Sequence, residues 1–160
     1  MKIETTRFGN LEIKEEKIIT FPRGIPGFEN VRRFFLLPVE GLEDIHWLQA
    51  VENPGVALLV IDPFKYFIDY SFEIPGPDLE ELEITEQAQV LVIAVVTIPG
   101  DDPALTTANL LAPVIINTRT SRARQIILNG LPYTTRHRLF PDMNSSSEKK
   151  KCNVSGGEGK

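Results

Sequence analysis

The side chains best suited to catalysis or metal binding are few in this sequence and stand far apart. His46 and His137 do not belong to clusters with the ligand spacing of a metal site. Cys152 stands in a polar C-terminal segment where no fixed base can activate it. Ser71 and Ser121 lack the flanking glycines of a hydrolase nucleophile elbow. We therefore expect neither a metal site nor a nucleophile-base pair.

Paired carboxylates are the remaining route to acid–base chemistry. The best candidates fall in one short segment and are Glu80, Glu81, Glu83 and Glu86. Residues on one exposed helical turn are poorly placed to enclose a substrate. Gly24 and Gly27 are not followed by the lysine and hydroxyl residue of a phosphate-binding loop. We predict that the protein is not an enzyme and holds no cofactor.

Charge is distributed unevenly along the chain, whose net formal charge is −5. Between Lys65 and Arg119 there is no lysine or arginine, whereas nine acidic residues fall in that interval. Such a stretch repels a phosphate backbone and attracts a basic protein surface. We expect no direct nucleic-acid binding, although Arg119 to Arg138 holds five arginines. A merely solvated acidic face is the alternative interpretation. The candidate partner contacts in this stretch are Glu73, Asp78, Glu80, Glu81 and Glu83.

Size and composition suit one domain. The chain has 160 residues, of which 42% are hydrophobic, and this is enough for an ordinary core. Its single cysteine excludes an internal disulfide, and its N-terminus lacks the apolar run of a signal peptide. No apolar run approaches the ~20 residues of a membrane-spanning helix. We expect a cytoplasmic monomer without membrane contact, folded over residues 1–143, with a disordered tail over residues 144–160.

The elements that must position these residues are mostly short β-strands. Segments rich in valine, isoleucine and aromatic residues alternate with turn residues, which is typical of a sandwich or barrel. Strands are predicted at 3–14 (two, around Gly9-Asn10), 17–21, 33–39, 45–51, 56–61, 66–74, 88–98, 106–110, 114–117 and 124–128. A helix is predicted at 77–84, capped by Asp78. The predicted fold class is all-β, a single-domain antiparallel β-barrel-like or sandwich structure with one short helix.

Two apolar regions are candidates for contact with a protein partner. The segment FPRGIPGFE (residues 21–29) contains prolines and glycines that fix a tight loop, and it can present Ile25 and Phe28. The segment 64–72 is dense in aromatic residues, so we expect some of them, including Phe72, to face outward. An exposed aromatic patch beside acidic residues is the usual anatomy of a protein-binding surface.

Three segments together resemble the FliW family of flagellar assembly factors. They are FPRGIPGFE at 21–29, WLQAVENPGVALLVIDP at 47–63 and TTANLLAPVIIN at 106–117. The order and spacing of the three segments carry the resemblance, since a single GIPGF would be weak. The resemblance extends from about Met1 to about Leu131 and does not cover the tail.

The resemblance implies a protein that binds flagellin and the translational regulator CsrA in alternation, so that flagellin synthesis follows its secretion. The acidic stretch would complement the basic RNA-binding face of CsrA. Flagellin's terminal segments are amphipathic helices, which would suit an apolar groove. Two alternatives stay open: a dedicated flagellin chaperone that does not bind CsrA, and an unrecognised small enzyme. The enzyme would need a deep pocket lined by groups with perturbed pKa values.

Overall fold

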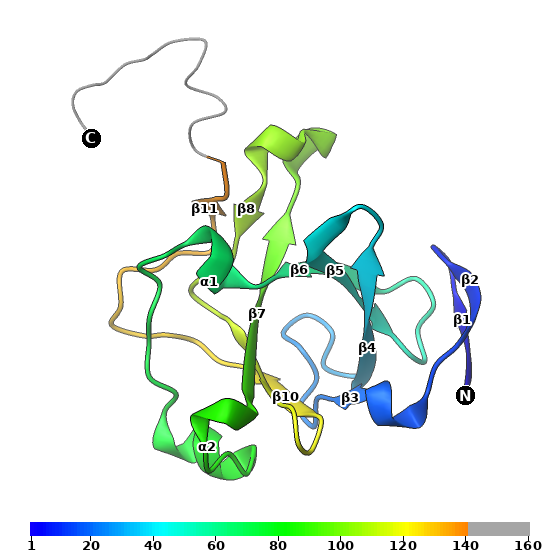
Figure 1. Ribbon diagram of the computed structural model, residues 1–160, viewed down its shortest axis with the longest axis horizontal. Coiled ribbons are helices and arrows are strands. Elements are labelled where there is room, and N and C mark those ends of the chain that lie inside the picture. Colours follow the sequence, from blue (N-terminus) through cyan, green and yellow to red (C-terminus); the bar gives the residue numbers. More distant parts are fainter. Residues whose placement is uncertain (141–160) are drawn as a thin grey trace.

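The computed structural model describes residues 1–140 of the chain (Figure 1). The tail predicted over residues 144–160 lies outside the described residues. The strands are β1 Lys2–Thr5, β2 Gly9–Glu12, β3 Ile19–Thr20, β4 Arg33–Val39, β5 Leu42–Ala50, β6 Ala57–Ile61, β7 Val90–Thr97, β8 Thr107–Ala108, β9 Val114–Asn117, β10 Arg122–Gln125 and β11 His137–Arg138. The helices are η1 Glu15–Lys17, α1 Pro63–Tyr66, α2 Gly76–Glu81, η2 Gln87–Gln89, η3 Pro99–Asp101 and η4 Pro103–Leu105.

Seven strands of the described chain close into a barrel. Their order is β7-β6-β5-β4-β3-β10-β9, and β9 returns to pair with β7. Neighbouring strands are antiparallel except β3 and β10, which meet in parallel at Thr20 and Arg122. The short strands β8 and β11 extend the sheet beyond β7, and β1 and β2 form a separate hairpin beside the barrel (Figure 1). The predicted all-β, barrel-like class is confirmed, and the β3–β10 pair is its one parallel exception.

The barrel interior is filled by one apolar cluster to which all seven strands contribute. It includes Phe34 of β4, Leu48 of β5, Val60 of β6 and Val114 of β9, each at most 1% exposed. Two further clusters lie outside the barrel wall. One is built around Ile3, Ile18 and Phe35 and holds the β1–β2 hairpin against β4. The other covers β7 and β9 with the segments around α1 and α2 and with residues 126–140.

Most of the barrel strands follow the sequence prediction. The predicted strand 33–39 is β4 with the same bounds, and β5, β6, β7 and β9 lie within or beside the predicted segments. The hairpin turn was misplaced, because Gly9 and Asn10 begin β2 instead of forming the turn. Thr5 fixes the actual turn: its hydroxyl accepts a hydrogen bond from the Phe8 N–H and donates one to the Gly9 carbonyl, both at 2.8 Å.

The segment 66–74 is not a paired strand, contrary to the prediction. Asp62 and Pro63 start the short helix α1 instead, because the Asp62 carboxylate accepts a hydrogen bond from the Phe64 N–H at 3.0 Å. The chain then runs without strand pairing to α2. The predicted cap of α2 is also wrong. Pro75 precedes that helix, and the Asp78 carboxylate lies inside its first turn and bonds to Arg124.

Candidate functional site

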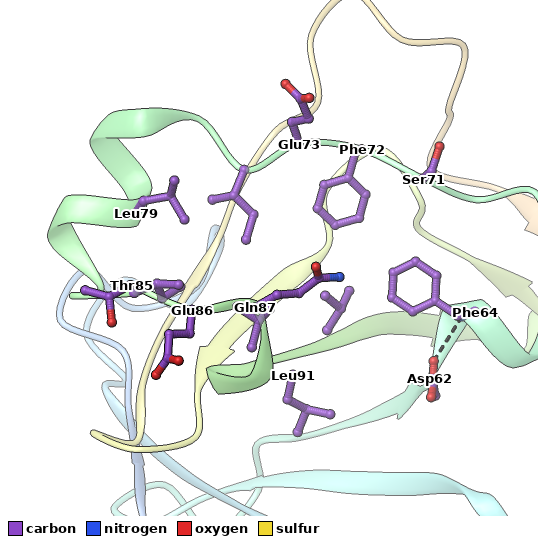
Figure 2. Close-up of a pocket in the computed structure, with 14 residues that line it drawn as sticks. Asp62, Phe64, Ser71, Phe72, Glu73, Leu79, Thr85, Glu86, Gln87 and Leu91 are labelled. Carbon is purple, nitrogen blue, oxygen red and sulfur yellow. Dashed lines mark hydrogen bonds between the residues drawn. The ribbon is translucent and has the colours of Figure 1, made fainter.

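An apolar groove of about 790 Å³ lies between the chain that follows α1 and the chain that leads from α2 into β7 (Figure 2). Its apolar lining is Phe64, Phe72, Ile74, Leu79, Ile84, Val90, Leu91 and Val92. Its polar lining is Asp62, Ser71, Glu73, Thr85, Glu86 and Gln87. Three of these lining residues carry a carboxylate and none is a lysine, arginine or histidine. The groove therefore joins an apolar interior to an anionic margin.

One wall of the groove is the chain from Tyr70 to Pro75. Figure 2 shows the Phe72 ring pointing into the groove and the Glu73 carboxylate pointing away from it. The rings of Phe72 and Phe64 stack with centroids 6.4 Å apart. Tyr70 anchors the wall from behind, since its buried hydroxyl donates to the Leu110 carbonyl at 2.8 Å. Burial raises the pKa of Tyr70, so this hydroxyl keeps its proton throughout the physiological range.

The opposite wall consists of α2 and the residues that follow it. Leu79 and Ile84 face the groove, whereas Leu82 is fully buried in the outer core. A buried amide holds the end of α2 to the barrel: the Asn117 Nδ2 donates to the carbonyls of Leu82 at 2.7 Å and Glu83 at 3.2 Å. A helix of six residues is not stable alone, so these tertiary contacts maintain it.

Two arginines from other parts of the chain neutralise part of the predicted acidic surface. The Arg124 guanidinium lies 2.5 Å from the Asp78 carboxylate and 3.3 Å from that of Glu81. Arg23 donates two hydrogen bonds of 2.9 Å to Glu81. The hydrogen bonds from Arg23, together with the charges of Arg124 and Arg23, lower the pKa of Glu81, although partial burial opposes this. Asp78 and Glu81 are therefore internal ion-pair partners rather than free partner contacts.

The other three acidic candidates differ from this pair. Glu73, Glu80 and Glu83 are exposed, and none takes part in an ion pair within residues 1–140. Glu83 follows α2 with a positive φ of 57°, a backbone conformation that directs the chain sharply away from the helix. Of these three, Glu73 lines the groove, whereas Glu80 and Glu83 lie on α2 and directly after it.

The loop at residues 21–29 presents only one of its two predicted contacts. Ile25 is 3% exposed and packs in the barrel core, whereas Phe28 is 37% exposed. Ile25 is buried and Phe28 exposed because the loop folds back on itself. The Phe28 N–H donates a hydrogen bond to the Ile25 carbonyl at 2.6 Å. Gly24 permits this approach: its φ is +68°, and a Cβ there would lie 2.6 Å from the Glu29 carbonyl oxygen. The Arg23–Glu81 ion pair ties this loop to α2.

The structure thus brings Phe72 and Glu73 to the lining of the groove. Glu80 lies on α2 and Glu83 just after it, outside the lining itself, and Phe28 lies on a loop that the Arg23–Glu81 ion pair joins to α2. Sequence reasoning missed the groove floor. Leu91 is 37% exposed there, although its strand reads as buried on both faces. Burial along β7 does not alternate from residue to residue, and the unbroken run of apolar residues in the sequence does not show that Leu91 is exposed.

The part of the chain that the structure describes lacks a metal-binding cluster, because no group of three histidine, cysteine, aspartate or glutamate side chains there could hold a metal ion. His137 is engaged structurally, since its Nε2 accepts a hydrogen bond from the Thr134 N–H at 2.9 Å. Fold and site define a small β-barrel that carries an apolar groove with an anionic margin.

Comparison with known proteins identifies the family. The family model of the FliW protein matches residues 2–139. The chain is 45% identical over 148 residues to the flagellar assembly factor FliW of Moorella thermoacetica, covering 92% of this chain and 94% of that protein. It is 42% identical over 134 residues to the flagellar assembly factor FliW of Thermosipho africanus, covering 84% of this chain and 92% of that protein.

A solved structure agrees with these sequence relatives. The crystal structure of a flagellar assembly factor FliW superposes with a TM-score of 0.81 at 38% identity, covering 89% of this chain and 99% of that one. The chain belongs to the FliW family. It is a flagellar assembly factor and not an enzyme, which confirms both the predicted resemblance and the predicted lack of catalysis. No helix within residues 1–140 is long and apolar enough to span a membrane.

The ion pairs of Glu81 predict a pH-dependent contribution to stability. Because the folded-state pKa lies below the ordinary value of 4.5, the contribution is present above pH 4.5 and is lost as pH falls through the lowered value. Glu81→Gln should reduce the free energy of unfolding at pH 7 by up to about 1 kcal/mol, the upper end for exposed ion pairs. Urea unfolding at pH 7 and at pH 3, which lie above and below the ordinary pKa of 4.5, measures the difference.

The matched control is Glu80→Gln, because Glu80 is exposed and has no ion pair in the described chain. Its effect should be small at both pH values. An equal loss for Glu81→Gln at pH 7 and at pH 3 would show that the two arginines contribute nothing through charge.

Proposed function

We propose that this protein binds flagellin and the translational regulator CsrA in alternation in the bacterial cytoplasm, and acts as a monomer. The exchange links flagellin synthesis to secretion, because CsrA held by this protein is not available to repress the flagellin message. One observation carries the proposal: the apolar groove and the unpaired carboxylates share the wall formed by α2 and the residues after it. Family membership supplies the flagellar context.

The two partners would use different chemistry on this shared wall. Flagellin would contact the apolar lining, chiefly Phe72 and Leu91, with Phe28 as an additional exposed ring nearby. A basic face of CsrA would meet the free carboxylates of Glu80 and Glu83. Because both partners need the same small region, the binding of each must weaken the other by the same factor.

The groove floor tests the flagellin half of the proposal. Leu91→Asn places a polar amide on the floor at a position that is already 37% exposed, so the fold should tolerate it. Flagellin affinity should fall by about tenfold (~1.4 kcal/mol), because apolar contact area is lost. Calorimetric titration with purified flagellin measures the change.

Leu42→Asn is the matched control, because Leu42 is 50% exposed in β5 and does not line the groove. Its flagellin affinity should equal that of the parent. If Leu91→Asn keeps the parental affinity while remaining folded, flagellin does not use the groove.

The free carboxylates test the CsrA half. The double variant Glu80→Lys, Glu83→Lys should slow CsrA association and flatten its dependence on salt, since exposed charges act mainly on the association rate. The effect should fade at high salt, where the screening length falls below the ~8 Å of physiological solution. Stopped-flow association at low and high salt measures both quantities.

The control double variant is Glu15→Lys, Glu16→Lys, which makes the same charge change on the exposed η1 segment, far from α2 (Figure 1). Glu81 is left intact in both variants, because its substitution would also break the ion pairs that hold α2. If Glu80→Lys, Glu83→Lys associates with CsrA at the parental rate and with the parental salt dependence, these carboxylates do not contribute to CsrA binding and are only solvated. Absence of any CsrA binding by the parent would favour the dedicated flagellin chaperone.

A further inference from the structure

The groove wall at residues 71–75 has the burial pattern of a β-strand but is not paired with one. Phe72 and Ile74 are half-buried and line the groove, whereas Ser71, Glu73 and Pro75 are exposed. This alternation has the period of two that an extended strand imposes. Figure 2 shows the consequence at two positions, where Phe72 points into the groove and Glu73 points outward.

The backbone of this wall is largely without hydrogen-bond partners. Its beginning is fixed by the Tyr133 hydroxyl, which accepts from the Ser71 N–H at 3.1 Å and donates to the Ser71 carbonyl at 3.0 Å. Its end is fixed where the Pro75 carbonyl accepts hydrogen bonds from the Asp78 and Leu79 N–H groups of α2, at 3.0 and 3.1 Å. Between these points, the N–H and C=O groups of Phe72, Glu73 and Ile74 bond to no group within residues 1–140.

The unbonded N–H and C=O groups of this segment are arranged like those at the edge of a β-sheet. In an extended chain the N–H and C=O of one residue point to the same side, and those of the next residue point to the other. Phe72 and Ile74 therefore share one edge, while Ser71 and Glu73 share the edge that Tyr133 partly occupies. The Phe72–Ile74 edge offers two N–H and two C=O groups, the set that an antiparallel neighbour would satisfy. Unpaired edges of this kind are templates for another chain.

The charge of the groove narrows the chemistry of that chain. Asp62, Glu73 and Glu86 line the groove, and no basic residue does. A segment with lysine or arginine beside its apolar residues would find opposite charges on both sides of the groove. An acidic segment would be repelled by these carboxylates, so the groove disfavours acidic partners.

We propose that residues 71–75 are an edge strand to which an extended segment of a protein partner adds. Its alternate apolar side chains enter the groove beside Phe72 and Ile74, and its basic residues lie against Glu73 and Glu86. The inference rests on the proposed function in taking the groove as a partner-binding surface, and it specifies the conformation and charge of the bound segment. Docking of an amphipathic helix in the same groove is the competing outcome.

Amide hydrogen exchange with a synthetic peptide distinguishes strand from helix. The probe is an octapeptide in which valine alternates with threonine, with a lysine added at each end. At saturation, the amides of Phe72 and Ile74 should exchange at least about tenfold more slowly, while that of Glu73 stays unchanged as an internal control. Failure of the peptide to bind, binding without this protection, or equal protection of all three amides would overturn the proposal.

Two comparisons make the test specific. A peptide of the same composition, with its valines spaced for one face of a helix, should bind at least about tenfold more weakly; equal affinity would contradict strand addition. Replacing the terminal lysines by glutamates should weaken binding to the parent, and the variant Glu73→Lys, Glu86→Lys should reverse that preference. No preference in either protein would contradict the charge assignment. Flagellin and CsrA are absent from these measurements, so their outcome is independent of whether the proposed partners bind.

Discussion

The pairing of β7 with two different strands along one edge determines where the groove forms. Residues Val90 to Ile93 pair with β9 and close the barrel, whereas Val96 and Thr97 pair with β8 and leave it. Closure of the barrel fixes the first half of β7. The outer surface of this half therefore forms a rigid floor for the groove, at the point where the chain enters β7 from α2. The other edge of β7 pairs with β6, whose end continues directly into α1. Both walls of the groove therefore begin at strands of the closed barrel.

Polar contacts between residues that are far apart in the sequence hold the walls of the groove in place. Asn117 at the end of β9 bonds the end of α2, Arg124 of β10 bonds its first turn, and Tyr70 bonds the carbonyl of Leu110. Each contact connects the covering segment to a part of the chain at least 35 residues away. This arrangement uses the carboxylates of Asp78 and Glu81 in internal ion pairs, whereas Glu80 and Glu83 are exposed and form no ion pair within residues 1–140. Under the proposed function, these two exposed carboxylates are the ones that meet a partner.

The sequence was informative where local pattern dominates. The strand at 33–39 combines aromatic and branched residues between turns, and its predicted bounds agree with β4. Local sequence pattern does not predict the burial or the partner of a side chain where contacts between distant parts of the chain determine them. Ile25 is buried because Gly24 folds the loop back on Glu29, and Asp78 meets an arginine 46 residues later. The sequence predicts a strand at 66–74, although Asp62 and Pro63 carry a helix start signal shortly before it. The groove combines residues from 62 to 92, and none of its geometry follows from spacing alone.

A titration with three purified components tests whether flagellin and CsrA compete for one wall of this barrel. Fluorescently labelled CsrA is bound to the protein, and flagellin is added while bound CsrA is followed by anisotropy. If the two partners compete, CsrA is released as flagellin saturates the protein, and excess CsrA displaces flagellin with the same coupling factor. A ternary complex in which CsrA affinity is unchanged by saturating flagellin would contradict this competition.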